Sequence, residues 1–149
     1  VTNMTATPSL IQRLQTERTA VENLYRAFSD KNPDLLDLAV TQDWDDIPLA
    51  PGQGPGPEGF KPLLASFITA FPDINIMVHD ILQEPGKIAV RAEITGTHLG
   101  EFMGIAPTGR RISVRLHEFH LLNGERVTTT WHMEDWFAMF QQLGQFPTR

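Results

Sequence analysis

Residues 111–144 read RISVRLHEFHLLNGERVTTTWHMEDWFAMFQQLG, and the rest of the chain is interpreted around them. Two runs of alternating apolar and polar residues flank Asn123-Gly124. This dipeptide favours a two-residue hairpin turn, because both central positions of a type I′ turn need a positive φ. The stretch therefore predicts a β-hairpin in which the turn fixes the pairing of the two strands.

The predicted register gathers polar side chains on one face of this hairpin. Counting outward from the turn places His117 opposite Thr130 and Arg115 opposite His132, and Phe119 shares their face because strand side chains alternate. The opposite face is mainly apolar. A polar face of this kind is either solvated or lines a pocket, and a phenylalanine among histidines favours the pocket.

Composition limits the class of protein. A chain of 149 residues, of which 41% are hydrophobic and 20% charged, fits one globular domain. The net charge is −6 and no run of Lys or Arg is present, so nucleic acid is not an expected partner.

The chain has no cysteine, which excludes disulfides, thiolate nucleophiles and cysteine-bound metals. No apolar run is long enough to span a membrane, and the beginning, VTNMTATPS, lacks the features of a signal peptide. These observations favour a soluble, cytoplasmic protein.

The order of predicted elements indicates an α+β fold. We expect a flexible lead at residues 1–8 and a single domain at 9–149. Helical spacing predicts helices at 9–29, from Pro33 to about 38, and at 59–71, and alternation predicts strands at 74–79 and 87–97 joined by Pro85-Gly86. After the hairpin, a short helix at 136–143 ends at Gly144. The helices would cover one face of a curved, mostly antiparallel sheet.

The segment 48–59 is rich in proline and glycine, which excludes a helix or a central strand. It is either a surface linker or a lid over a pocket. Trp44, among the aspartates that precede it, is a candidate for the edge of such a pocket.

Three kinds of site find little support. A metal site at His117, His120 and His132 is not expected, because His117 and His120 point to opposite faces of a strand and no third ligand joins the other pair. The glycines at 52, 54 and 56 follow no predicted strand, so they do not form a nucleotide-binding turn. No sequence motif of a serine or cysteine nucleophile is present.

General acid–base catalysis fits the hairpin best. Neutral histidine can accept a proton near pH 7, and we expect Arg115 to favour that form of His132 and to stabilise a developing oxyanion. His117 would orient the substrate or share the proton. The alternative is that Arg115 only pairs with Glu134 or Asp135. Asp135 either caps the closing helix or supports a histidine.

Three motifs resemble those of the SnoaL-like polyketide cyclases, a branch of the NTF2-like α+β barrels. They are GTHLGEFMGIAPTGRR at 96–111, HEFHLLNGER at 117–126 and WHMEDWFAMFQQLG at 131–144. The first helix and the FPD at 71–73 extend the likeness over most of the chain.

This resemblance implies a cone-shaped barrel with an apolar interior, an aromatic polyketide substrate, no cofactor or metal, and a homodimer or tetramer. By this likeness His132 stands where the cyclases carry an acid–base aspartate, His117 matches their cavity histidine and Arg115 a neighbouring polar residue. Further residues expected to contact the substrate are Trp44, His98, Phe119, Thr130 and Asp135.

The histidine at 132 shifts the expected reaction toward hydroxylation. Similar proteins on this scaffold resemble anthracycline hydroxylases, which use no cofactor of their own and rely on a separate reductase. A neutral base could deprotonate an electron-rich phenol so that dioxygen attacks the resulting carbanion. Intramolecular aldol cyclisation is the second expectation, and a non-catalytic barrel that binds a small molecule is the third.

Overall fold

The structure is a computed structural model that describes residues 8–148. Its elements follow the order α1 (Leu10–Ser29), a 3-10 turn (Pro33–Leu35), α2 (Leu36–Ala39), β1 (Val40–Ile47), α3 (Gly56–Ala70), β2 (Asn75–Glu84), β3 (Lys87–Thr97), β4 (Arg111–Leu122), β5 (Val127–Glu134) and α4 (Trp136–Leu143). Apart from Pro8, the flexible lead predicted at 1–8 lies outside the described residues.

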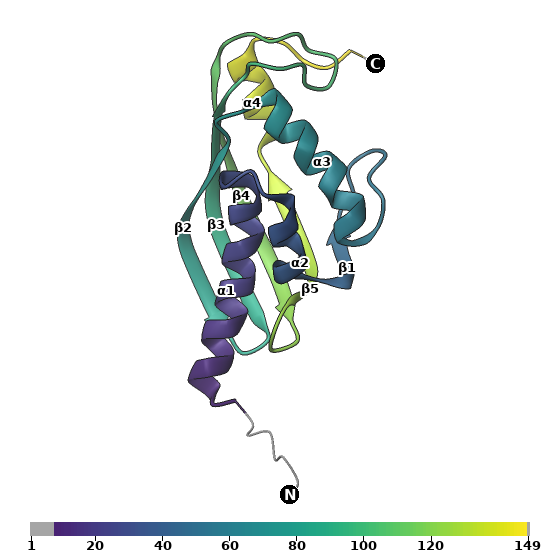
Figure 1. The fold of residues 1–149 in the computed structure, drawn as a ribbon. Helices are drawn as coiled ribbons and strands as arrows, with labels where there is room; N and C mark the ends of the chain where they lie inside the picture. The colour runs from purple at the N-terminus through teal and green to yellow at the C-terminus, as the bar shows by residue number, and fades with distance from the viewer. Residues whose placement is uncertain (1–7, 149) are drawn as a thin grey trace, which may run out of the picture.

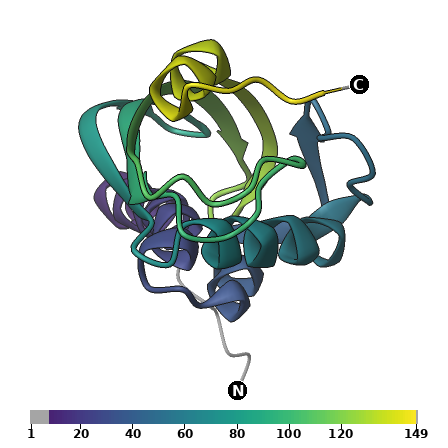
Figure 2. The same cartoon turned by 90° about the horizontal axis from the view of Figure 1, so that it is seen from above.

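One five-stranded sheet, in the order β1-β5-β4-β3-β2, forms the framework. All neighbouring strands pair antiparallel except β1 and β5, which are parallel. The sheet is strongly curved, with α1, α2 and α3 on its concave side (Figure 1). Viewed from above, α4 lies across one end of the curve and the loop that follows β3 crosses the same end (Figure 2). The predicted α+β architecture is confirmed.

The predicted helices form with small changes at their ends. Ser9 caps α1, accepting a hydrogen bond from the amide of Gln12 while the Gln12 side chain bonds back to the amide of Ser9. Gly144 adopts φ 74° directly after α4, as expected of a left-handed cap. Helix α3 begins at Gly56, three residues before the predicted start, so the exclusion of a helix from 48–59 is wrong for its last four residues, where Pro57 lies in the first turn of the helix.

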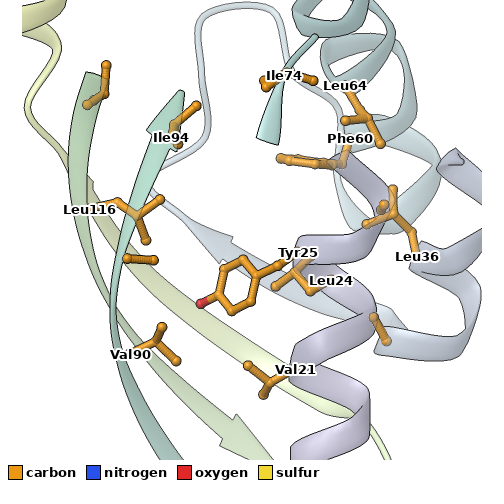
Figure 3. Packing of buried hydrophobic residues seen from close by; sticks show 14 of the residues in the cluster. Val21, Leu24, Tyr25, Leu36, Phe60, Leu64, Ile74, Val90, Ile94 and Leu116 are labelled. Carbon is orange, nitrogen blue, oxygen red and sulfur yellow. The ribbon is translucent and has the colours of Figure 1, made fainter. Parts of the chain in front are cut away.

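The hydrophobic core fills the space between these helices and the concave face of the sheet. Figure 3 shows Val21 and Leu24 of α1 packed with Leu36, Phe60 and Leu64, opposite Val90, Ile94 and Leu116 of the sheet; all are buried. Tyr25 of α1 points its hydroxyl group away from the helix toward the sheet (Figure 3). The core thus contains a polar group that faces β4.

The predicted hairpin register is wrong by three residues. Asn123–Arg126 form a longer connection, in which the Asn123 side chain accepts hydrogen bonds from the amides of Glu125 and Arg126. Leu122 therefore pairs with Val127. Leu121 pairs with Thr129, so that Thr128 is skipped in a β-bulge.

The bulge has the larger effect on which residues face inward. The longer turn shifts the pairing by two residues, which leaves every side chain on its predicted face, whereas the single extra residue reverses the faces of β5 relative to β4. His132 consequently pairs with Glu118 instead of Arg115. The backbone carbonyl of Arg115 accepts a hydrogen bond from the amide of Asp135.

Strand β1 was not predicted from the sequence. This strand carries Trp44 and ends just before the segment rich in proline and glycine. It lies at the edge of the sheet, where a strand needs pairing on one side only and leaves a weak pattern in the sequence.

Candidate functional site

The two faces of β4 differ sharply in character. Its inward residues alternate as Ile112, Val114, Leu116, Glu118, His120 and Leu122, all buried, and its outward residues are exposed or half-buried. Arg115, His117 and Phe119 lie on the outward face, so the predicted pocket made by these side chains with His132 does not exist. Arg115 lies 3.5 Å from Asp135, the alternative pairing considered above.

A chain of hydrogen bonds crosses the interior from α1 to β1. The Tyr25 hydroxyl donates to Glu118 Oε2 at 2.7 Å, and its oxygen lies 2.9 Å from His120 Nε2. On the other side of the ring, His120 Nδ1 lies 2.9 Å from Thr130 Oγ1, which also accepts from Trp44 Nε1 at 3.0 Å. Every side chain in this chain is buried, and the predicted residues Trp44 and Thr130 are both part of it.

His132 lies beside this chain, on the inward face of β5. Its Nδ1 is 2.9 Å from a carboxylate oxygen of Glu134, and its Nε2 is 2.7 Å from the backbone carbonyl oxygen of Pro48 and 3.5 Å from Asp46 Oδ1. The His132 side chain is 20% exposed, and those of Glu134 and Asp46 are 12% and 4% exposed. The imidazole is therefore reachable only at its edge.

These partners make His132 a cation. A carbonyl and an ionised carboxylate only accept hydrogen bonds, so both ring nitrogens must carry a proton to satisfy them. Burial lowers the pKa of His132, but the hydrogen bond and charge of Glu134, the charge of Asp46 and the Pro48 carbonyl outweigh it and raise the pKa to about 9. The expectation of a neutral, basic His132 beside an arginine is wrong for this reason.

The pKa values of two carboxylates near His132, those of Asp46 and Glu118, are shifted in opposite directions. Burial raises the pKa of Asp46, and a hydrogen bond from Gln53 together with the charge of His132 offsets only part of the rise. Burial also acts to raise the pKa of Glu118, but hydrogen bonds from His120 and Tyr25 and the attraction of both histidines leave it lowered. Asp46 is thus the more basic of the two carboxylates.

Two further predicted residues have structural partners. Asp135 caps α4, accepting a hydrogen bond from the amide of Ala138, so the capping role is confirmed. His98 is buried in the loop after β3, where its Nδ1 accepts from the amide of Thr108 and its ring packs against Phe71. Burial lowers the pKa of His98, which favours its neutral form.

Within residues 8–148, no three histidine or acidic side chains are arranged to hold a metal ion. No helix in that range is long and apolar enough to cross a membrane. Two shallow grooves flank α1, and neither contains His132.

The arrangement pairs a buried proton donor with a buried proton acceptor. His132 offers an acidic N–H, and Asp46, 3.5 Å away, offers a carboxylate of raised basicity. Five residues of this site were not predicted from the sequence: Tyr25, Asp46, Glu118, His120 and Glu134. One signal was present, since Glu118 and His120 interrupt the otherwise apolar set Ile112, Val114, Leu116 and Leu122, and a polar residue at a core position often has a function.

Comparison with known proteins gives the family. Residues 18–143 match the SnoaL-like polyketide cyclase profile. The chain belongs to the SnoaL-like polyketide cyclase family. No curated protein matches it at a significant level.

Solved structures of similar proteins have the same fold. IdmH from Streptomyces antibioticus, provisionally assigned as a polyketide cyclase, is 28% identical with a TM-score of 0.74, over 86% of this chain and 98% of that one. TsrD from Streptomyces laurentii has 23% identity and a TM-score of 0.81, over 89% and 97% of the two chains. AclR from Streptomyces galilaeus, provisionally assigned as a hydroxylase, has 24% identity and a TM-score of 0.75, over 94% and 89%. The likeness to TsrD and AclR shows the fold alone.

The charge of His132 predicts how the protein responds to alkali. Because its pKa is higher in the folded state than its ordinary 6.5, the stabilisation is complete below pH 6.5 and is lost as the pH rises through about 9. After a discount for partial exposure, the loss is about 2 kcal/mol. Imidazole NMR should give a midpoint near 9 for His132, and E134Q should lower it by about one to two units.

E93Q is the matched control, because Glu93 contacts His79 on the outward face and should leave His132 unchanged. A midpoint near 6.5 that E134Q does not move would contradict the charged state of His132.

Proposed function

We propose that the protein closes a ring in an aromatic polyketide by an intramolecular aldol reaction, with Asp46 as the base and His132 as the acid. The observation that carries the proposal is the imidazolium of His132, which donates from both nitrogens on a buried face and lies 3.5 Å from a buried carboxylate of raised pKa. Membership of the polyketide cyclase family supplies the class of substrate.

The reaction needs one proton acceptor and one proton donor. A base removes a proton from the carbon next to a carbonyl, and the resulting enolate carbon attacks a second carbonyl in the same molecule. The new alkoxide then takes a proton from the acid. Asp46 performs the first step and His132 the last. The reaction involves no oxidation or reduction of the substrate. The N–H of His132 also stabilises the negative charge that develops on the oxygen.

Hydroxylation was the first expectation because it suited a neutral histidine beside Arg115. Arg115 lies on the opposite face of the sheet, and His132 is charged, so the two features that favoured hydroxylation are absent. Aldol closure uses the charged histidine directly as an acid. Hydroxylation with a separate reductase, and ligand binding without turnover, are the other outcomes that an assay can reveal.

Mass spectrometry of the product distinguishes these reactions. With an anthraquinone that carries both an activated methylene and a side-chain ketone, we expect an isomer or a product lighter by one water, whereas hydroxylation adds one oxygen. H132Q and D46N should each lower kcat/KM by about 10² to 10⁴, the usual contribution of general acid–base catalysis.

H117Q is the matched control, since it makes the same substitution on the outward face and should retain full activity. An equal loss of activity in H117Q and H132Q would overturn the assignment. Binding without any turnover would favour a non-catalytic barrel.

We also propose that the outward face of the sheet pairs with a second copy of the chain. Leu82, Ala89, Phe119 and Trp131 are successive cross-strand partners and form one apolar row. Leu82 is 75% exposed and Phe119 is 53% exposed. Soluble monomers seldom expose a continuous apolar row of this kind.

The row and its charged neighbours are self-complementary. A two-fold axis parallel to the strands, between β3 and β4, would exchange these two strands between the copies. The small Ala89 would then meet the large Phe119, and Glu93 would meet the exposed Arg115, because each pair is in register across the axis. Both contacts would occur twice.

Analytical ultracentrifugation tests this pairing. We expect a dimer for the wild type and a monomer for F119D, because a buried unpaired carboxylate is costly. R115E should weaken the dimer and the double variant E93R/R115E should restore it. L38D, which places the same charge at an exposed leucine of α2, should remain dimeric. A monomeric wild type or a dimeric F119D would contradict the proposal.

A further inference from the structure

The loop between β1 and α3 covers both proposed catalytic groups. Pro48 places its carbonyl oxygen 2.7 Å from His132 Nε2. The Gln53 amide nitrogen donates to Asp46 Oδ2 at 2.8 Å, and its amide oxygen accepts from the backbone of Ala50 at 2.9 Å. The loop therefore occupies the hydrogen-bonding positions that a substrate needs.

The two ends of this loop pack against the rest of the protein, and its tip is exposed. Strand β1 holds the first end at Ile47, which pairs with Trp131. At the second end, Gly59 packs directly on the backbone of Gly54, leaving no room for a side chain. Between these ends, Leu49 is 47% exposed and Pro51 and Gly52 are also exposed. Movement of the segment from Pro48 to Gly52 would uncover His132 while the pairing of Ile47 with Trp131 is kept.

The chemistry of the Pro48 carbonyl indicates which kind of substrate group can replace it at His132. The atom on His132 Nε2 is a neutral carbonyl oxygen, which accepts a hydrogen bond and carries no charge. Two carboxylates, Asp46 and Glu134, already lie against the same ring and outnumber its single positive charge. A second anion at Nε2 would be repelled, whereas a ketone or quinone oxygen would fit.

We propose that the Pro48 carbonyl stands where the acceptor carbonyl of the substrate binds, and that Gln53 positions the covering loop. This inference rests on the proposed aldol function, since it identifies the oxygen that receives the proton from His132. The substrate displaces Pro48, so the closed loop competes with it. The site selects a neutral aryl ketone or quinone and rejects a carboxylate.

Binding of two small probes to the whole chain tests the inference without turnover. 1-Tetralone is a neutral bicyclic ketone, and 1-naphthoate is a carboxylate of similar size. We expect the wild type to bind 1-naphthoate at least about tenfold more weakly, because of the charge repulsion. H132Q should lose 1-tetralone binding.

Q53A should bind 1-tetralone about five- to tenfold more tightly than the wild type, because loss of two hydrogen bonds makes the open loop more populated. Tighter binding by Q53A would indicate that Gln53 positions the loop, because structural damage would weaken binding instead. Q83A is the matched control, since Gln83 is also a half-buried glutamine whose side chain holds a backbone group, donating to the carbonyl of Leu14 far from this loop. Q83A should bind as the wild type does.

Chemical modification gives a second readout. Diethyl pyrocarbonate reacts with an accessible, unprotonated imidazole nitrogen, so at a fixed pH near 9, where part of His132 is neutral, Q53A should increase the rate at His132 about tenfold, while Q83A should not. Unchanged or weaker 1-tetralone binding in Q53A, equal binding of the two probes, or no 1-tetralone binding at all would overturn the inference. Aldol turnover with an unresponsive Q53A would leave the proposed function intact, and ketone binding without turnover would remove only that function.

Discussion

The rest of the site depends on the β-bulge at Thr128. Thr128 is skipped in the pairing of β5 with β4, and a strand that gains one unpaired residue exchanges its two faces relative to its neighbour. Because of this bulge, His132 faces inward with Glu118 and His120, while Trp131 and Met133 face outward. One extra residue thus places His132 in the buried polar cluster and Trp131 in the apolar row of the outer surface.

Burying a charge in this fold is possible because its partners are supplied by several elements. An isolated imidazolium would lose its proton in an apolar interior, but Glu134, Asp46 and the Pro48 carbonyl satisfy both nitrogens of His132. Glu118 is likewise satisfied by a hydrogen bond from the hydroxyl group of Tyr25 on α1. The groups that would conduct catalysis are therefore held by the packing of α1, β1, β4 and β5 together.

Much of the fold could be predicted from the sequence, because it rests on local patterns. The ends of α1 and α4 follow from Ser9 and Gly144, and the hairpin of β2 and β3 follows from Pro85-Gly86 between alternating runs. The pairing across Asn123-Gly124 could not be obtained in this way. Asn123 uses its side chain to build a longer turn, and the bulge at Thr128 leaves no local mark in the sequence.

The site was predicted only in part for the same reason. His132, Trp44 and Thr130 were identified, whereas Arg115 and His117 were placed with them by a register that the bulge reverses. Asp46 and Gln53 reach the site from a strand and a loop far from the hairpin in the sequence, so only the three-dimensional packing brings them to His132.

A crystal structure with a bound polycyclic ketone is the most direct measurement of the central claim, that His132 presents an acidic N–H to the substrate from the inner face of the sheet. The account predicts the ligand's carbonyl oxygen within about 2.7–3.2 Å of His132 Nε2, with Pro48 displaced. A ligand seated on the outer face beside Arg115 and His117, or one held inside while Pro48 stays on His132, would contradict it.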